Sequence, residues 1–342
     1  MIECIFTLDY EIYGNGEGSL RELVLKPAEK LRILFKKHNA RFVIFVEAAE
    51  LEIIGAAHAD PTIDLVEEQI RGFHREGFEV GLHLHPQWYN ARYEDGHWQL
   101  DYGEYNLCRL SSDRIDQIID RSIAYLQKVL EAPNYTPLSF RAGNWLLQPT
   151  GAAAKSLGGH GIKVDSSVFK GGFQHQQNLD YRRARKNGYY WAFSEDVNVP
   201  DPRGILLEIP TFTQMVPIWK MLTAKRIGLQ QKGPVNIQHR QKRLARLRDF
   251  SRFHHPMKLD FCRLTAAEMI RMFDQEMEKD RRDPSLFRPI VAIGHTKDLV
   301  DLNAVEEFLS YLHECRIEIS TFDSISRRIQ LPNPKTRPQR LA

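Results

Sequence analysis

The sequence predicts an α/β protein, an irregular (β/α) barrel of about seven or eight units within one domain. Short runs rich in β-branched and aromatic residues alternate with segments of helical periodicity along most of the 342 residues. This alternation favours parallel strands joined by helical crossovers. So many units in one chain of this length favour a barrel, although an open doubly wound sheet would show similar periodicity.

Eight segments are predicted to be strands. They are short and apolar, as expected for parallel strands that are buried on both faces. In chain order they span residues 2–8, 41–46, 79–83, 138–141, 163–164, 205–209, 289–293 and 316–319.

Helices are predicted between these strands, where apolar residues recur every three or four positions. The segment 61–76 has a proline in its first turn and stops at Gly77, and the segment 111–130 has Ser112 as its predicted N-cap. The predicted helices span residues 23–38, 61–76, 111–130, 265–279 and 303–313.

The composition is that of an ordinary soluble protein, with 42% hydrophobic and 27% charged residues. The four cysteines are far apart and include no Cys-x-x-Cys pair, so we expect reduced thiols rather than disulfides or a thiolate zinc site. The chain shows no secretory leader pattern and no run of about 18 apolar residues. We therefore expect a cytoplasmic protein.

Two histidines one residue apart are the most informative local feature. His83 and His85 follow an apolar run and precede Pro86. Side chains two residues apart on a strand share a face, so both imidazoles would point the same way at the end of the strand. Neutral imidazole is a preferred ligand for zinc and its neighbours. The pattern is typical of a metal site, and equally of a hydrogen-bonded histidine pair.

Further polar residues lie at the ends of the other predicted strands. In (β/α) barrels the catalytic residues come from the C-terminal ends of several strands. A ring rich in carboxylates and imidazoles at those ends indicates a metal-assisted hydrolase. The ring consists of Asp9, Glu11, His83, His85, Arg141, Asp165, Glu208 and His295.

Five segments that carry these residues resemble, in order, the motifs of the polysaccharide deacetylase family (carbohydrate esterase family four). The first resembles Thr-Phe-Asp-Asp-Gly, and the fifth resembles an apolar strand that ends in histidine. The resemblance is specific for the superfamily and weak for the substrate. The segments are residues 7–11, 83–87, 140–145, 164–168 and 290–295.

The resemblance implies a deacetylase-type barrel that removes an N-acetyl or similar acyl group from a sugar or glycan precursor. Asp9 matches the catalytic base, Arg141 the residue that orients this base, and His295 the general acid. Glu11 and His83 match ligands of one divalent metal ion. Zinc is the first choice for such ligands, with nickel, cobalt or iron as alternatives.

Four further residues are expected to contact the substrate in a protein of this family. Tyr10 and Trp145 would form walls of the sugar site, and Asp165 would fix the substrate or orient a histidine. The fourth is Gln87.

Three positions depart from the family pattern. Tyr10 replaces the second aspartate of the first motif, so metal ligation shifts to Glu11 or to the preceding Asp9. Gln87 occupies the position of the second ligand histidine, so His85 substitutes for it, or Gln87 itself ligates, or the metal is bound weakly. A glycine, at position 143, replaces the proline of the third motif.

Two other classes of protein fit parts of the pattern. Amidohydrolase barrels also use a His-x-His pair, but theirs follows the first strand, and further histidines follow the fifth and sixth. Here the pair follows the third predicted strand, and no histidine ends the fifth or sixth. The non-enzymatic alternative is a catalytically decayed barrel that acts as a glycan- or anion-binding module.

Positive charge is concentrated in one segment. Residues 220–258 contain eleven Lys and Arg against one acid, in a chain of net charge +3. The segment falls in a predicted basic helical insertion at about 213–260, within a barrel domain that spans 1–330. This charge favours an anionic partner, which is either a nucleotide- or lipid-linked sugar or an anionic membrane face, and not a specific nucleic acid. The alternative is that the basic residues only form the solvated face of a helix. The tail, 331–342, is expected to be disordered.

Overall fold

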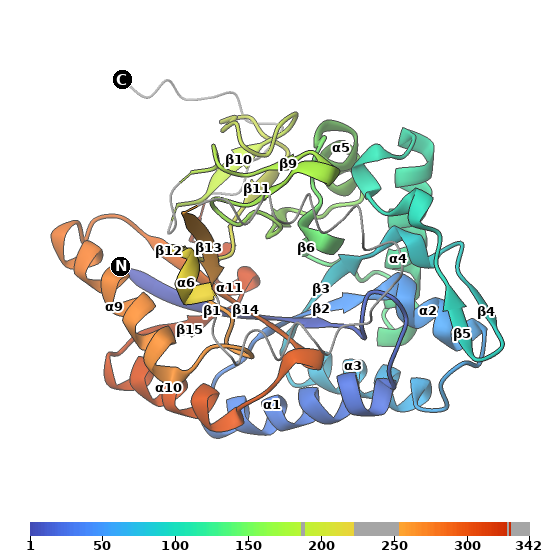
Figure 1. The fold of residues 1–342 in the computed structure, drawn as a ribbon, viewed down its shortest axis with the longest axis horizontal. Coiled ribbons are helices and arrows are strands. Elements are labelled where there is room, and N and C mark those ends of the chain that lie inside the picture. Colours follow the sequence, from blue (N-terminus) through green and yellow to red (C-terminus); the bar gives the residue numbers. More distant parts are fainter. Residues whose placement is uncertain (186–188, 222–252, 327, 330–342) are drawn as a thin grey trace.

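The protein folds as a curved, mostly parallel β-sheet with helices on its outside (Figure 1). The computed structural model describes residues 1–185, 189–221, 253–326 and 328–329. The main sheet has nine strands in the order β10-β11-β7-β6-β3-β2-β1-β14, with β15 also paired to β1. Its strands are β1 (Ile2–Tyr10), β2 (Val43–Glu47), β3 (Glu79–Leu84), β6 (Ser139–Ala142), β7 (Val164–Asp165), β10 (Trp191–Phe193), β11 (Leu206–Glu208), β14 (Arg288–His295) and β15 (Glu318–Ser320).

The curl of the sheet makes it a partly open barrel. Isolated parallel bridges join Thr211 to Val291 and Asp260 to Ile293, so the chain after β11 and the chain after the insertion both reach β14. The amide of Phe212 donates to the carbonyl of Val291 at 2.9 Å. The predicted irregular (β/α) barrel is confirmed.

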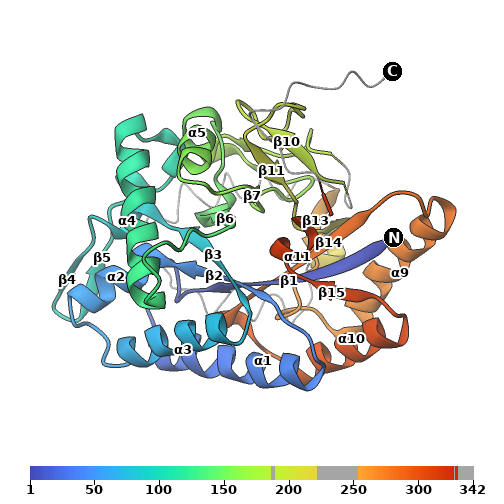
Figure 2. The same ribbon diagram turned by 180° about the vertical axis from the view of Figure 1, so that it is seen from behind.

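Helices cover the outer face of the sheet, as the front and rear views show (Figures 1 and 2). Helices α1, α3, α9 and α10 lie along one side of the molecule, and α4 and α5 lie beyond β6 and β7. The helices are α1 (Lys26–Lys37), α2 (Ala48–Ala56), α3 (Ile63–Arg75), α4 (Ser112–Leu130), α5 (Gly151–Gly159), α6 (Ile218–Met221), α9 (Ala266–Arg282), α10 (Leu302–Glu314) and α11 (Phe322–Ser326).

All the predicted strands and helices are present, with ends that differ by a few residues. One detail is corrected: Ser111, not Ser112, caps α4, because its hydroxyl accepts a hydrogen bond from the amide of Arg114 at 3.3 Å. The sequence did not predict α2 or α5. The apolar residues of α2 are spread around the helix and α5 is rich in glycine, so neither helix shows the spacing of a half-buried helix.

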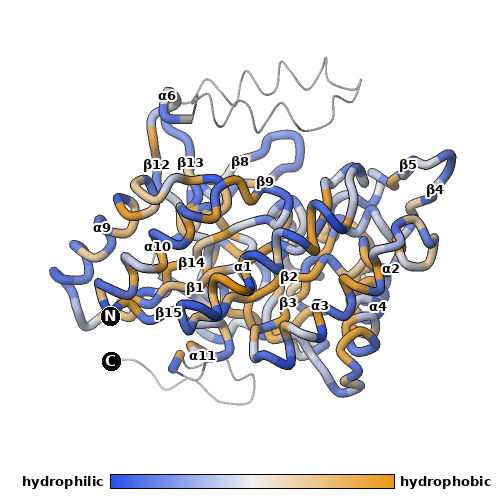
Figure 3. The backbone as a smooth tube through the Cα atoms, turned by 90° about the horizontal axis from the view of Figure 1, so that it is seen from below, coloured by the Kyte–Doolittle hydropathy of each residue, from blue (hydrophilic) through white to orange (hydrophobic). Residues whose placement is uncertain are grey.

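The two faces of the sheet bury different side chains. On β1, Phe6 and Leu8 point outward into a large core between the sheet and the helices. Ile5 points into the barrel, where it packs with Phe45 and Val291. Figure 3 shows apolar stretches along β1, β2 and β3. Because neighbouring side chains alternate between faces, Thr7 and Asp9 share the inner face with Ile5.

The insertion begins and ends as a β-ribbon rather than as helices. β12 (Thr213–Pro217) pairs antiparallel with β13 (His254–Lys258), and the short helix α6 follows β12. Residues 222–252, which include nine of the eleven basic residues, lie outside the described part of the chain, as does the tail from 330. Two smaller hairpins are β4 (Arg92–Glu94) with β5 (His97–Gln99), and β8 (Phe173–Gln174) with β9 (Leu179–Asp180).

All four cysteines are unpaired, and Cys4, Cys108 and Cys262 are buried. Among the helices of the described ranges, none has the length and apolar character needed to cross a membrane.

Candidate active site

The register of the parallel strands brings the predicted polar residues together at the C-terminal ends of β1, β3, β6 and β14. Asp9 on β1 pairs with His295 on β14. His83 on β3 pairs with Arg141 on β6 on one side and with Glu47 on β2 on the other. All of these positions face the inside of the barrel, so residues far apart in sequence meet in one place.

Glu11, His83 and His85 form a buried trio of metal-ligating side chains. Oε2 of Glu11 lies 3.1 Å from Nε2 of His85 and 3.7 Å from Nε2 of His83. This oxygen is buried and makes no hydrogen bond of good geometry. A carboxylate oxygen without a donor is costly inside a protein, and a cation between it and the two ring nitrogens would satisfy it. The trio therefore fits a divalent metal ion.

The outer nitrogen of His83 is held in the state that a metal ligand requires. Its Nδ1 lies 2.8 Å from the carbonyl oxygen of Arg141. A carbonyl only accepts, so Nδ1 carries a proton, and in the neutral ring Nε2 then has its lone pair toward Glu11 and can bind a metal.

The outer nitrogen of His85 faces two side-chain amides. Nδ1 lies 3.3 Å from Nε2 of Gln87 and 3.2 Å from Nδ2 of Asn144. Oε1 of Gln87 is buried without a hydrogen-bond partner. Both groups are donors as placed, which puts the proton of His85 on Nε2; exchanging the oxygen and nitrogen of both amides would let an amide oxygen accept from Nδ1 and free Nε2 for a metal. Gln87 thus supports His85 from behind, and His85 faces Glu11.

Gly143, which replaces the proline of the third motif, lets β6 end close against His85. A Cβ atom at position 143 would lie 2.4 Å from the carbonyl oxygen of Leu84 and 2.8 Å from Cγ of His85. Neither group can withdraw without moving the strand or the ligand, so a larger residue would displace His85.

The second oxygen of Glu11 is bound by a lysine that the sequence did not single out. Nζ of Lys297 lies 2.8 Å from Oε1 of Glu11 and 2.8 Å from the carbonyl of Ile12. Burial alone would raise the pKa of Glu11, but the charge of Lys297 and the two nearby histidines hold that pKa well below its usual value. Glu11 is therefore ionised, as a ligand must be.

Asp9 and Arg141 form a buried ion pair beside the trio. Nη1 of Arg141 lies 2.6 Å from Oδ1 of Asp9, and the two residues are 1% and 2% exposed. The guanidinium also donates to the hydroxyl of Thr7 at 2.9 Å and to the carbonyl of Ser166 at 3.0 Å. Burial would raise the pKa of Asp9, yet the charge of Arg141 outweighs it and lowers that pKa.

His295 approaches the same aspartate from β14. Its Nε2 lies 3.4 Å from Oδ2 of Asp9, and its Nδ1 lies 3.6 Å from Oδ2 of Asp298. Burial lowers the pKa of His295 to about 4, so the ring is neutral at physiological pH. Asp9 also forms a second candidate metal cluster with Glu11 and His295.

Two buried glutamates on and after β2 complete the surroundings of the trio, and the sequence did not predict them. Oε1 of Glu47 accepts from the amide of His85 at 2.6 Å, and Oε1 of Glu50 accepts from the amide of Ile12 at 2.8 Å. Burial raises the pKa of both, that of Glu50 to about 8. Glu47 could have been singled out, because it directly follows the second predicted strand, 41–46, as the other residues of the predicted ring follow or end theirs.

Asp165 belongs to a buried network separate from the trio. It is fully buried, and its Oδ1 accepts from the hydroxyl of Ser167 at 2.6 Å. The carboxyl of Glu208 faces it, and burial raises the pKa of both. The hydroxyl of Ser167 in turn accepts from the amide of Ala142. This network supports the end of β6 and holds Asp165 among buried side chains.

Tyr10 is not at the site, which corrects the expectation that it forms a wall. Its hydroxyl donates to Oε1 of Gln69 on α3 at 2.7 Å, and its ring packs edge-on against Phe73. The reason is strand alternation: Asp9 points into the barrel, so the next residue points out.

Trp145 does lie beside the site. Its ring centroid is 5.5 Å from Cζ of Arg141 and 5.3 Å from the ring of Phe169. Lys258, the last residue of β13, places Nζ 3.8 Å from the centroid of Trp145 and 4.2 Å from that of Phe169. The sequence placed Lys258 in the basic insertion, whereas the structure places it at this wall.

Comparison with solved structures identifies the architecture. No family model matches the chain, and no curated protein matches it in sequence. A protein from Mycobacterium smegmatis with a polysaccharide deacetylase assignment superposes with a TM-score of 0.54 over 99% of this chain and 94% of its own, at 15% identity. The fold is that of the polysaccharide deacetylases.

Two further structures agree. A protein from Pseudomonas aeruginosa PAO1 with the same assignment gives a TM-score of 0.51 at 13% identity and covers 98% of this chain and 93% of its own. A Puue allantoinase gives 0.51 at 12% identity, over 98% and 92%. Proteins that share the polysaccharide deacetylase fold therefore differ in substrate, and the chemistry must be argued from the site.

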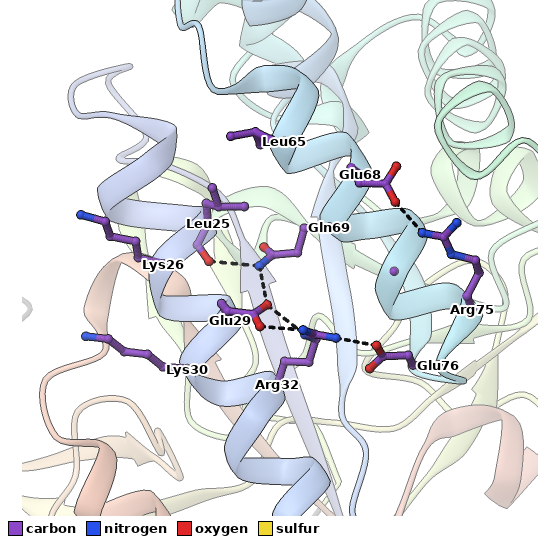
Figure 4. Close-up of a pocket in the computed structure, with 11 residues that line it drawn as sticks. Leu25, Lys26, Glu29, Lys30, Arg32, Leu65, Glu68, Gln69, Arg75 and Glu76 are labelled. Carbon is purple, nitrogen blue, oxygen red and sulfur yellow. Dashed lines mark hydrogen bonds and ion pairs between the residues drawn. The ribbon is translucent and has the colours of Figure 1, made fainter.

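A separate groove lies between α1 and α3, outside the sheet (Figure 4). It has a volume of about 600 Å³. Its arginines are paired, Arg32 with Glu29 and Arg75 with Glu68. It shares no residue with the barrel site and is not assigned a function.

Proposed function

We propose that the protein is a metal-dependent hydrolase that removes an N-acetyl or similar acyl group from a sugar or glycan precursor. The observation that supports this most strongly is the unsatisfied Oε2 of Glu11 between Nε2 of His83 and Nε2 of His85, directly beside the Asp9–Arg141 pair. Zinc is the first choice of ion, because two imidazoles and one carboxylate suit it.

Glu11, His83 and His85 would hold the ion, which when bound would polarise the acyl carbonyl and lower the pKa of a water molecule. Asp9 is ionised and accepts the proton of the attacking water. Arg141 keeps the carboxylate of Asp9 in one orientation through the 2.6 Å contact.

His295 completes the proton transfers. It is neutral in the resting site and lies 3.4 Å from Asp9, so it can receive a proton from Asp9 and pass it to the departing amine. Trp145 offers an aromatic face for the sugar ring. The four outer groups around the trio, which are Arg141, Gln87, Lys297 and Glu47, all support the ligands, and a decayed barrel would have no use for such support.

Acetate release from N-acetylglucosamine oligomers tests this proposal. The protein is stripped with chelator and then loaded with zinc, and Asp9→Asn is compared with wild type. Loss of the general base should reduce turnover by about 10²–10⁴-fold. Asp180→Asn, which alters an exposed pair with Arg182, serves as the control. Near-wild-type acetate release by folded Asp9→Asn protein would rule out this role.

The partner and the location are parts of the same proposal. The charge of the basic segment supports a nucleotide- or lipid-linked sugar as substrate, with peripheral contact between residues 220–258 and an anionic membrane. The four unpaired cysteines support a cytoplasmic location.

A further inference from the structure

Lys258 stands out among the cations of the site because of what surrounds it. Its ammonium group lies over two aromatic faces, 3.8 Å from the ring centroid of Trp145 and 4.2 Å from that of Phe169. Within the described part of the chain it makes no ion pair and no hydrogen bond, although an ammonium group carries three donors. Arg141 and Lys297 are different, because each is paired with a carboxylate, Asp9 and Glu11 respectively.

The strand that carries Lys258 aims it at the site. It ends β13 and lies opposite Thr213 in the β12–β13 ribbon. The charges of Asp260 and Arg263 act most strongly on the pKa of Lys258, and Asp9 and Arg141 are close enough to change it as well. Trp145 connects the two regions, because its ring also lies 5.5 Å from the guanidinium carbon of Arg141. A sugar placed against Trp145 would therefore have the Asp9–Arg141 pair on one side and Lys258 on the other.

The energetics favour an anion at this position. Burial, which removes water from the ammonium group, lowers the pKa of Lys258 to about 7. The faces of two aromatic rings favour the charged form but supply none of the hydrogen-bond acceptors that the ammonium group needs. The charge of Asp260 favours the ammonium form but makes no ion pair with it, so a negatively charged ligand group would supply both the acceptors and a paired counter-charge.

We infer that Lys258 binds a negatively charged group, a carboxylate or a phosphate, on the sugar that occupies the site. The inference rests on the proposed function for the sugar and the acyl group, and it adds the class of substrate, which is an acidic N-acyl sugar. Phe169 and Trp145 hold the lysine side chain in place, and the ammonium group selects the acidic sugar over its neutral counterpart.

Calorimetric titration tests the inference without requiring turnover. The probes are N-acetylglucosamine, N-acetylglucosamine 1-phosphate and N-acetylmuramic acid, which differ in charge and in the type of acid. Wild type should bind one of the two acidic sugars about ten- to hundredfold more tightly than the neutral one, the range expected for a hydrogen bond to a charged group. Which acid is preferred decides between phosphate and carboxylate.

Lys258→Met keeps the length of the side chain and removes its charge. It should abolish the preference for the acidic sugar and leave the affinity for N-acetylglucosamine unchanged, while Lys258→Arg should retain most of the preference. Lys220→Met, on the exposed surface of α6, is the matched control and should behave as wild type. If Lys258→Met does not fold, Lys258→Gln replaces it.

Two results would overturn the inference. One is an equal loss of affinity for neutral and acidic sugars in Lys258→Met, which would make the lysine a structural part of the wall. The other is a wild-type protein with no preference for the acidic sugars. If no sugar binds measurably, the same titration with inorganic phosphate and acetate decides: saturable heat in wild type that Lys258→Met loses supports the inference, and its absence in wild type refutes it.

The outcomes also separate this inference from the proposed function. Zinc-dependent acetate release from neutral oligomers without any acidic preference would leave the hydrolase intact and remove only the role of Lys258. A preference for acidic sugars in a protein that releases no acetate would support the role of Lys258 and remove the hydrolase.

Discussion

Removing the charge of Asp9 should lower the stability of the fold as well as the rate of catalysis. Asp9 and Arg141 are 2% and 1% exposed, and their closest atoms are 2.6 Å apart. Asp9→Asn keeps the shape of the side chain but leaves the guanidinium buried without a counter-charge. Breaking a buried ion pair from one side costs about 3–5 kcal/mol. We expect Asp9→Asn to lower the free energy of unfolding by that amount.

A double-mutant cycle isolates the pair itself. Arg141→Met alone strands the carboxylate of Asp9 and also frees Thr7 and Ser166, so it should cost at least as much. The double variant buries neither charge, and its loss should fall short of the sum of the two single losses by about 1–3 kcal/mol, the usual coupling between residues in contact.

Urea denaturation of metal-free protein at neutral pH is the assay. The control is the Asp180–Arg182 pair, which has the same 2.6 Å separation but side chains that are 37% and 54% exposed. Asp180→Asn should cost no more than about 1 kcal/mol, because water screens an exposed pair. Strict additivity in the Asp9–Arg141 cycle, or an equal cost for Asp180→Asn, would refute the reasoning.

Three further predictions follow from single side chains. Burial raises the pKa of Glu50 to about 8, so its protonated form stabilises the fold at low pH, and that stability is lost as pH rises from about 4 through 8. In chelator-treated protein, the unfolding free energy of Glu50→Gln should therefore fall less between pH 5 and 8.5 than that of wild type. Parallel pH profiles of the two proteins would contradict this. Trp145→Ala should raise KM for N-acetylglucosamine oligomers and leave turnover of a small acetamide nearly unchanged; equal effects on both substrates would remove Trp145 from the sugar site. Tyr10→Phe loses the 2.7 Å hydrogen bond to Gln69, and should cost about 1 kcal/mol in urea denaturation without changing kcat/KM; a loss of kcat/KM would return Tyr10 to the site.

The fold was predictable because its strands are buried on both faces and its helices are amphipathic. The runs at 2–8 and 79–83 became β1 and β3 for this reason. α2 lacks that contrast, since its apolar residues are not confined to one face, and it was missed. The ribbon of β12 and β13 was also missed, because its two strands are separated by more than thirty residues, far more than in an ordinary hairpin.

The candidate site was predictable where residues share one strand face. His83 and His85 lie two positions apart and point the same way, as alternation requires. Tyr10 was misplaced because the motif comparison ignored that same alternation.

Other contacts of the site could not be predicted from the spacing of residues in the sequence. Lys297 reaches Glu11, and Lys258 reaches Trp145, through segments that only the folded barrel brings together. Both lysines could be assigned to the site only from the structure.

The metal content of the protein tests the central claim most directly. Protein purified without chelator is analysed for bound zinc, nickel, cobalt and iron, beside His83→Ala and the control His97→Ala, which changes an exposed histidine on β5. The trio of Glu11, His83 and His85 predicts about one divalent ion per chain in wild type and in His97→Ala, and a large loss in His83→Ala. Equal metal content in all three proteins, or no metal in wild type even after incubation with zinc, would contradict the account.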